Sequence, residues 1–212
     1  MNIRPARETD SPFIAWVELA AARSHRPVGV FDLAFPGESE VRLNLIDRIT
    51  HAEPKSICHW SGFLVAEVEG EPAAALSGYE PSAHHDNTFG KAFFNALREA
   101  DWSEEEIQAC FMRMAPSATC MPDPDDDTWI IEWVATRADF RGRGLAAALL
   151  NEILEEGRRR GYQKSQISLL IGNDGAQRVY SSAGFAVFDE VRHESFEAAY
   201  GSPGVRRMRR DL

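Results

Sequence analysis

The sequence predicts an α/β fold in which helices flank a mixed, mostly antiparallel central sheet. Residues 129–136 have the pattern of a buried strand, and a turn connects them to a long amphipathic helix that begins near residue 145. Residues 63–67 and 72–79 have the pattern of a β-hairpin, which makes the sheet mixed. Strands that alternate with helices are typical of layered α/β proteins.

Local patterns predict the other elements. We expect further strands at residues 2–5 and 166–171, and helices at residues 11–22, 38–51, 89–100, 103–114 and 145–160. Asp10 or Ser11 is expected to cap the first helix, because Pro12 suits the first helical turn. Ser103 and Glu106 have the spacing of a capping box, which predicts that a helix begins there.

Length and composition predict one compact domain over residues 1–212, with 44% hydrophobic and 26% charged residues. No stretch of 18 consecutive apolar residues occurs, and the N-terminus has no apolar run, so we expect neither a membrane span nor a signal peptide. The expected location is the cytoplasm. The three cysteines lack a Cys-x-x-Cys spacing, which indicates reduced thiols.

The formal net charge of −10 disfavours two broad classes of partner, nucleic acids and membranes. A strongly acidic chain repels the phosphate backbone of nucleic acids and offers no basic surface for anionic lipids. We therefore expect no nucleic-acid partner and no membrane partner. A phosphate-containing ligand would need a local cluster of positive charge, which Arg137, Arg141 and Arg143 supply.

The turn at residues 141–146 has the features of an anion site. A helix begins directly after it, and the first N–H groups of a helix have no partner within the helix and attract anions. Gly142 and Gly144 allow the backbone to approach a ligand closely, while Arg141 and Arg143 add positive charge. The sequence therefore predicts phosphate binding at this turn.

The same glycines also match the spacing of a dinucleotide-binding fingerprint, but their context does not. In that fingerprint the first glycine directly follows a strand, whereas residues 137–141 intervene here. Lys164 and Ser165 stand where an acidic residue would bind the ribose, and too little chain follows Gly144 for the remaining units. A P-loop is excluded because no Gly-Lys-Ser/Thr is present at the turn.

The run Arg141-Gly142-Arg143-Gly144-Leu145-Ala146 resembles the signature of the GNAT superfamily of acyl-CoA-dependent N-acyltransferases. Residues 165–185 are similar to a second motif of that family, with Asn173, Ala176, Tyr180, Gly184 and Phe185 at the matching positions. The two ends of the chain and the hairpin are also similar to GNAT elements, and residues 204–212 correspond to the final strand. The similarity is poor over residues 23–60 and 80–127, which we interpret as insertions beside the acceptor site.

The resemblance implies the GNAT fold, in which the parallel strands 129–136 and 166–171 splay apart to admit the coenzyme. It implies that acetyl-CoA is the acyl donor, and the sequence gives no reason to expect a metal. The positions that the resemblance assigns to coenzyme binding are Val134, Ala135, Thr136, Arg141, Gly142, Arg143, Gly144, Leu145, Ala146, Asn173, Ala176 and Tyr180. Asn173 also has the position of a helix N-cap, and the two roles are compatible. Members of the family often form dimers, so a homodimer is a further expectation.

Glu132 is the predicted general base. It is an acid within the apolar run 129–135, and an unpaired carboxylate in such a place is costly unless it has a partner or a chemical task. A salt bridge to an arginine, or a side chain that faces water, is the alternative. A base is useful because an alkylamine has a pKa of about 10.4 and must lose a proton before it attacks a thioester.

Tyr180 is the predicted general acid. It lies seven residues after Asn173, on the same face of the expected short helix, where the family places a tyrosine near the coenzyme sulfur. Its phenol could protonate the departing thiolate. The alternative is a packing role, which is common for tyrosines on short helices. We expect the backbone N–H of Val134 to hold the carbonyl oxygen.

The predicted function is transfer of an acetyl group from acetyl-CoA to a primary amine of a small molecule or peptide, by direct attack in a ternary complex. The alternative is a GNAT-fold module that binds or senses an acyl-CoA without turnover, which would need neither Glu132 nor Tyr180. The acidic run Asp123, Asp125, Asp126 and Asp127 could attract a cationic amine, or could be a solvated loop. His84, His85 and Asp86 lack a convincing metal-ligand spacing.

Overall fold

The computed structural model describes residues 1–121 and 124–212, and the side chains of all of these except His84 and His85. Within these residues, seven strands form one sheet in the order β1-β2-β3-β4-β5-β7-β6. The strands are β1 (Asn2–Pro5), β2 (Phe63–Val68), β3 (Glu71–Tyr79), β4 (Thr128–Thr136), β5 (Lys164–Leu170), β6 (Ala186–Arg192) and β7 (Gly204–Asp211). Only β4 and β5 pair in parallel, so the predicted mixed, mostly antiparallel sheet is confirmed.

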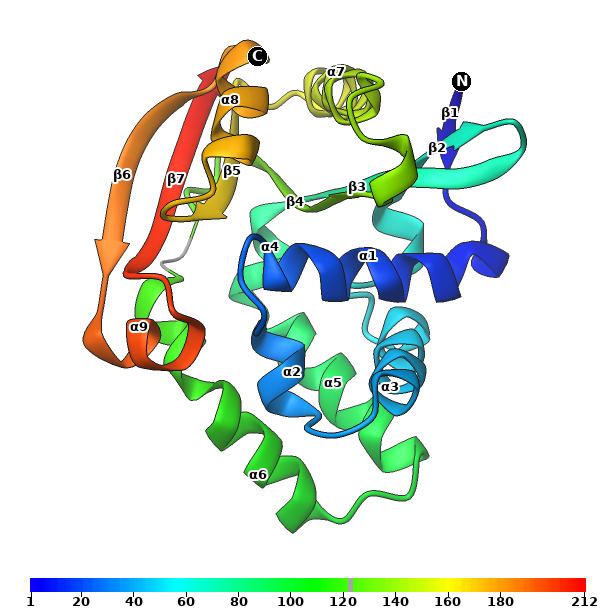
Figure 1. Ribbon diagram of the computed structural model, residues 1–212, viewed down its shortest axis with the longest axis vertical. Helices are drawn as coiled ribbons and strands as arrows, with labels where there is room; N and C mark the ends of the chain where they lie inside the picture. Colours follow the sequence, from blue (N-terminus) through cyan, green and yellow to red (C-terminus); the bar gives the residue numbers. More distant parts are fainter. Residues whose placement is uncertain (122–123) are drawn as a thin grey trace.

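Helices cover both faces of this sheet (Figure 1). The described helices are α1 (Ser11–Arg23), α2 (Val30–Ala34), α3 (Ser39–His51), α4 (Pro81–His85), α5 (Thr88–Glu99), α6 (Glu104–Met114), α7 (Leu145–Arg159), α8 (Asp174–Ser182) and α9 (Glu194–Tyr200). Helix α7 packs on one face of β3 and β4, and α1 packs on the other. None of the helices within the described ranges is long and apolar enough to cross a membrane.

The helices between β1 and β4 form a second apolar cluster below α1. Helices α2, α3, α5 and α6 gather there in Figure 1, and they come from the two segments interpreted as insertions. Aromatic rings hold the cluster together, since Phe93 stacks on Phe35 with ring centroids 5.4 Å apart and meets Phe111 at 5.1 Å. The inserted segments therefore form a packed layer under the sheet rather than long surface loops.

The sheet divides into two parts where β4 leaves β5. The two strands pair only from Thr128 opposite Lys164 to Ile131 opposite Ile167, although β4 continues to Thr136 and β5 to Leu170. Beyond Ile131 the edge of β4 that faces β5 therefore has no strand partner among the described residues. This is the splayed parallel pair of strands that the resemblance to the GNAT superfamily implied. Figure 1 shows the two parts of the sheet diverging.

Most predicted elements are present within one or two residues of the expected bounds, which is the usual uncertainty of helix and strand ends. Ser103 caps α6 as expected, because its hydroxyl accepts the Glu106 N–H at 3.2 Å and its own N–H bonds the Glu106 carboxylate at 2.8 Å. Asp10 occupies the N-cap position of α1, as one of the two predicted caps, but its side chain makes no capping hydrogen bond. Its carboxylate binds Arg4 at 2.6 Å instead, and Ser11 is the first residue of the helix.

Helix α7 packs closely on the sheet because glycine occupies the contact. A Cβ built on Gly78 in β3 would lie 2.6 Å from Cζ2 of Trp129 and 2.7 Å from Cδ1 of Ile153. Trp129 and Ile153 are almost completely buried, so neither side chain has free space into which it could move. This contact fixes the height of α7 above β4, and with it the position of the turn that precedes α7.

We predict that Gly78→Ala lowers the free energy of unfolding by about 1–3 kcal/mol, because the added methyl group overpacks a filled core. Gly62→Ala is the matched control, since its Cβ would lie 3.8 Å from the nearest atom, an ordinary contact. Urea denaturation of both variants checks this. Equal stability of the two variants would contradict the close packing described here.

Candidate active site

A cavity of about 940 Å³ lies between the diverging strands. Strand β4 lines it from Glu132 to Thr136, and β5 lines it from Ile167 to Leu170. The predicted coenzyme-binding residues Val134, Ala135, Thr136, Arg141, Gly142, Gly144, Leu145, Ala146, Asn173, Ala176 and Tyr180 all line the same cavity, as does Glu132. The fold thus brings together residues that the sequence placed on two strands, a turn and a helix.

A β-bulge in β4 directs two consecutive side chains toward α1. Ala75 of β3 pairs with Ala135 and Ser77 pairs with Glu132, so Leu76 alone lies opposite Trp133 and Val134. Trp133 has a φ of 55°, in the left-handed region that a bulky residue rarely adopts. Trp133 consequently packs with the clusters on the α1 side of the sheet, while Val134 packs with the α7 side. The bulge places Glu132 and the Trp133 indole side by side at the cavity.

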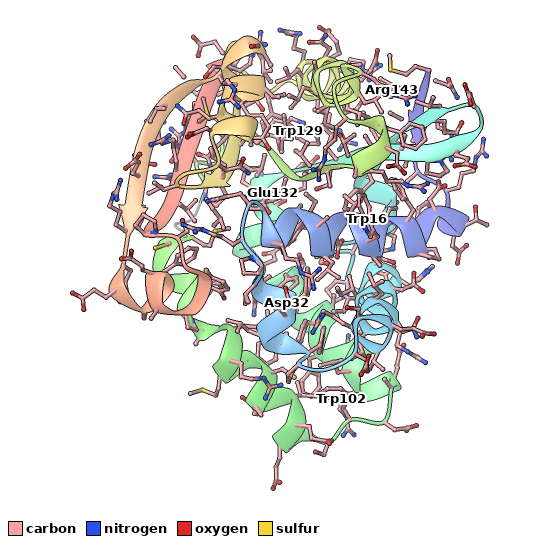
Figure 2. The ribbon with its side chains drawn as sticks, viewed as in Figure 1. Trp16, Asp32, Trp102, Trp129, Glu132 and Arg143 are labelled. Atoms are coloured by element: carbon pink, nitrogen blue, oxygen red, sulfur yellow. The ribbon has the colours of Figure 1, made fainter. Side chains whose placement is uncertain are left out.

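Glu132 lies in the middle of the molecule, where the two parts of the sheet separate (Figure 2). Its remaining exposed surface faces the large cavity and a small adjoining one lined by Tyr79 and Gln166. Burial raises the pKa of the Glu132 carboxyl to about 7, and a hydrogen bond with Tyr79 opposes that rise. A carboxyl with this pKa exchanges a proton readily near neutral pH.

The salt bridge considered for Glu132 is absent from the described ion pairs. Tyr79 is its hydrogen-bonding partner, and burial beside Glu132 raises the pKa of the Tyr79 phenol well above its usual value. The phenol therefore stays protonated and donates to the carboxylate. A neutral donor of this kind positions the carboxylate without neutralising its charge.

A second buried acid lies behind Glu132. Glu18 of α1 is completely buried, its carboxyl lies against the Cys58 thiol, and neither oxygen has a well-formed hydrogen bond to any described residue. Burial raises the pKa of Glu18 well above its usual value. Burial also raises the pKa of the Cys58 thiol, and the nearby carboxyls of Glu18 and Glu132 add to that rise. The groups packed behind Glu132 are thus a carboxyl and a thiol whose burial favours their neutral forms.

Tyr180 lies across the cavity from β4, on α8. It is buried, and its ring packs edge-on against Phe185, with centroids 6.5 Å apart. Burial raises the pKa of the Tyr180 phenol well above its usual value, so the hydroxyl keeps its proton. The structure places Tyr180 in the core and at the cavity wall at once, which makes its predicted packing and chemical roles compatible.

Asn173 caps α8, as one of the two predicted roles requires. Its carboxamide oxygen accepts the Ala176 N–H at 3.1 Å, and its carboxamide nitrogen donates to the Ser24 hydroxyl at 2.7 Å. The Ser24 contact ties the end of α1 to the turn after β5, on the far side of the cavity. Asn173 therefore helps to close the cavity, and its contact with a coenzyme stays a prediction.

The turn before α7 presents an open backbone to the cavity. Gly142 and Gly144 have φ values of 75° and 76°, and a Cβ on either would meet nothing within 4 Å. Arg141 lines the cavity, and its Nε donates to the Thr136 carbonyl at 3.3 Å. Arg143 differs, because it is not among the lining residues and its guanidinium lies over the Phe140 ring, 5.0 Å from the centroid. Its predicted coenzyme contact stays a prediction.

The described part of the acidic loop does not line the large cavity. Asp125 pairs with Arg209 at 2.8 Å and Asp127 pairs with Lys164 at 2.9 Å, which holds the pKa of Asp127 below its usual value. Asp123 lies outside the described residues. No group of three His, Cys, Asp or Glu that could hold a metal was found among the described residues, and the side chains of His84 and His85 are not part of that set.

Some residues at the site were not predicted from the sequence. Tyr79 gave no signal, because only the strand register brings it to Glu132. Glu18 could have been recognised from the sequence. It follows Ile14 by four residues, on the buried face of α1, and an acid on an apolar helix face is unusual. Helix α9 was also missed, although its Phe196 and Tyr200 line the cavity.

Comparisons with known proteins agree with this geometry. A family model described as Acetyltransferase (GNAT) family matches residues 31–185. The structure is similar to a crystal structure described as an acetyltransferase (TM-score 0.73, 19% identity, covering 100% of both chains). It is also similar to an N-acetyltransferase from Staphylococcus aureus Mu50 (TM-score 0.70, 22% identity, 100% of both chains).

A third similar structure, from Salmonella typhimurium, was solved with its cofactor acetyl-CoA (TM-score 0.53, 17% identity, covering 100% of this chain and 94% of that one). At these identities the structural matches show the fold alone. The search among curated proteins found no match.

We predict that Glu18→Gln stabilises the protein in a pH-dependent way. The pKa of Glu18 is raised above the reference value of 4.5, so the folded protein binds a proton that the unfolded chain releases as the pH rises. The stability that the protonated Glu18 contributes is therefore complete below the unfolded pKa and is lost as the pH rises through the raised pKa of the folded state, whereas the amide does not titrate.

Urea denaturation at several pH values checks this, with the exposed Glu152→Gln on α7 as the control. The stability difference between Glu18→Gln and wild type should grow with pH and should be absent for the control. A difference that does not change with pH would show that Glu18 is not held protonated.

Proposed function

The chain belongs to the GNAT family of acyl-CoA-dependent acetyltransferases, and on that premise we propose that it acetylates a primary amine of a small molecule or peptide by direct attack in a ternary complex. The observation that carries this proposal is Glu132, a carboxyl with a pKa of about 7 in the cavity between the splayed strands. A protein that only bound an acyl-CoA would have no need for a titrating carboxyl there.

The residues around the cavity fit acetyl-CoA as the donor. The free edge of β4 after Ile131 offers backbone groups to a flexible arm with amides, and the start of α7 offers N–H groups to a pyrophosphate. Arg141 adds positive charge at the same end. When bound, acetyl-CoA would supply an activated thioester carbonyl, and every other contribution comes from the side chains and backbone of this chain.

Glu132 removes the proton of the incoming amine. A carboxylate with a pKa of about 7 is ionised in about half of the molecules at neutral pH and is a stronger base than an ordinary glutamate. Its attraction for the ammonium form also positions the amine between the strands. Tyr79 holds the carboxylate in place through their hydrogen bond.

Tyr180 donates a hydrogen bond to the sulfur as negative charge develops on it. The raised pKa of its phenol keeps the proton available across the neutral range, but it also makes complete proton transfer less favourable. Stabilisation of the thiolate by hydrogen bonding is therefore the main contribution that we assign to Tyr180. The unpaired edge of β4, at Val134, supplies an N–H for the carbonyl oxygen.

Release of the free coenzyme A thiol from acetyl-CoA tests the proposed function. The assay compares pools of alkylamines, arylalkylamines, amino acids, polyamines and aminoglycosides, and short peptides, with a no-amine control. Amine-dependent release is the expected result. Saturable acetyl-CoA binding without release from any pool would contradict the enzyme and favour the alternative, a binding or sensing module.

We predict that Glu132→Gln changes the shape of the pH profile as well as the rate. In wild type, kcat/KM should rise up to the pKa of about 7 and then level off, because the carboxylate accepts the proton of the ammonium substrate. In Glu132→Gln it should be about 100-fold lower at neutral pH and should keep rising toward the amine pKa of about 10.4.

Tyr79→Phe provides a second test of the pKa assigned to the Glu132 carboxyl. Loss of the hydrogen bond that opposes the rise should move the pKa of Glu132 further up, so the rise in kcat/KM should occur at higher pH. A profile of Glu132→Gln with the same shape as wild type would rule out the base role.

We predict that Tyr180→Phe lowers kcat by about tenfold or more, because the thiolate loses its hydrogen-bond donor. Tyr162→Phe is the matched control, since Tyr162 packs on Trp129 and does not line the cavity. Steady-state kinetics with saturating donor checks this. A kcat within about twofold of wild type would exclude the proposed role of Tyr180.

A further inference from the structure

The end of the cavity away from the α7 turn has an apolar wall. Its side chains come from the inserted segments and from α9, and they are Val30, Ile57, Phe89, Met114, Phe196 and Tyr200. Phe196 and Tyr200 are buried and pack at a tilt with ring centroids 4.6 Å apart, and Phe89 contacts Phe93 of the core with centroids 5.7 Å apart. Trp133 of the bulge adds a third aromatic surface beside Glu132.

Charge is scarce along this cavity. Among its described lining residues, the groups that can carry a charge near neutral pH are His25, Glu132 and Arg141. Arg141 lies at the α7 end. Burial and the nearby Arg26 lower the pKa of His25, so its imidazole is mostly neutral at neutral pH. Glu132 is consequently the single carboxylate that the described lining offers to a cationic acceptor.

Within the described part of the acidic loop, no carboxylate is added to this lining. The described lining includes neither Asp125 nor Asp127, and both form ion pairs, with Arg209 and Lys164 respectively. A second ammonium group in the acceptor would therefore enter an apolar surface without a matching negative charge, which is strongly unfavourable. An apolar or aromatic body in the same place would gain from burial.

We propose that the acceptor is a primary amine with one positive charge and an apolar or aromatic body, such as an arylalkylamine, and that polyamines and aminoglycosides are poor acceptors. This inference rests on the proposed function. Glu132 binds the amino group at the point where the strands separate, and the wall formed by Ile57 and by residues of α2, α5, α6 and α9 holds the remainder of the molecule.

The test compares acceptors that differ in one property. Butylamine and 1,4-diaminobutane have the same carbon chain and differ by one ammonium group, while butylamine and phenethylamine differ by an aromatic ring. We expect kcat/KM to be about tenfold or more higher for butylamine than for the diamine, and higher again for phenethylamine. Calorimetry of phenethylamine and spermidine with the protein alone gives a reading that is independent of turnover, and phenethylamine should bind more tightly.

The outcomes separate this inference from the proposed function. Turnover in which the diamine, spermidine or kanamycin is preferred over phenethylamine would overturn the inference and leave the acetyltransferase intact. Absence of thiol release with every amine would overturn the proposed function and the inference with it. Preference for the monoamines, with phenethylamine best, would support both.

A negative charge introduced into the apolar wall provides a second test, because it should shift the acceptor preference toward diamines. Val30→Asp adds a carboxylate to the apolar surface, so kcat/KM for 1,4-diaminobutane relative to butylamine should rise about tenfold or more. Val41→Asp is the control, because Val41 is 57% exposed on α3 and does not line the cavity. Circular dichroism establishes that both variants fold.

Phe89→Leu keeps the wall apolar and replaces Val30→Asp as the test of the wall if that variant does not fold. It should lower kcat/KM for phenethylamine more than for butylamine, because an aromatic contact is lost. An unchanged preference in a folded Val30→Asp protein, or an equal effect of Phe89→Leu on both amines, would overturn the assignment of this wall to the acceptor.

Discussion

The structure depends on the point at which β4 stops pairing with β5. Pairing ends at Ile131 and Ile167, yet both strands continue, so one edge of β4 has no strand partner in the described part of the chain over the length of the cavity. Buried backbone groups without partners are costly, and a protein tolerates them where a ligand satisfies them. The inserted helices and α9 then enclose the opening, and Figure 1 shows them gathered below α1 and beneath β6 and β7. The site is thus a consequence of the sheet and needs no separate domain.

The bulge at Trp133 and Val134 determines what this opening contains. Without it, regular alternation would direct the Trp133 side chain toward α7, away from Glu132. With it, Glu132 and Trp133 share the α1 side, next to the protonated Glu18 and the Cys58 thiol. Among the described residues that line the cavity, Glu132 is the single acid, so its carboxylate is the negative charge that meets the amine. Burial of Glu18 behind it favours the neutral form of that carboxyl.

The sequence predicted the elements that carry periodic patterns or specific end signals. The capping box at Ser103 and the hairpin of β2 and β3 are examples, as is the turn before α7. Helices α2 and α9 have five and seven residues, too short for a periodic pattern to be recognised. At the site, Glu132 was found because an acid interrupts an apolar strand. Tyr79 and the wall residues Phe196 and Tyr200 were missed because tertiary packing alone brings them to the cavity.

The central claim is that the fold holds Glu132 as a carboxyl that titrates near neutral pH. The direct test is carbon-13 NMR of glutamate side-chain carboxyls in the ligand-free protein across a pH series, with the Glu132 signal assigned by its loss in Glu132→Gln. The expected midpoint for that signal is about pH 7. A midpoint near the ordinary glutamate value of about 4.3 would contradict it, because the carboxylate would then be too weak a base for the assigned role.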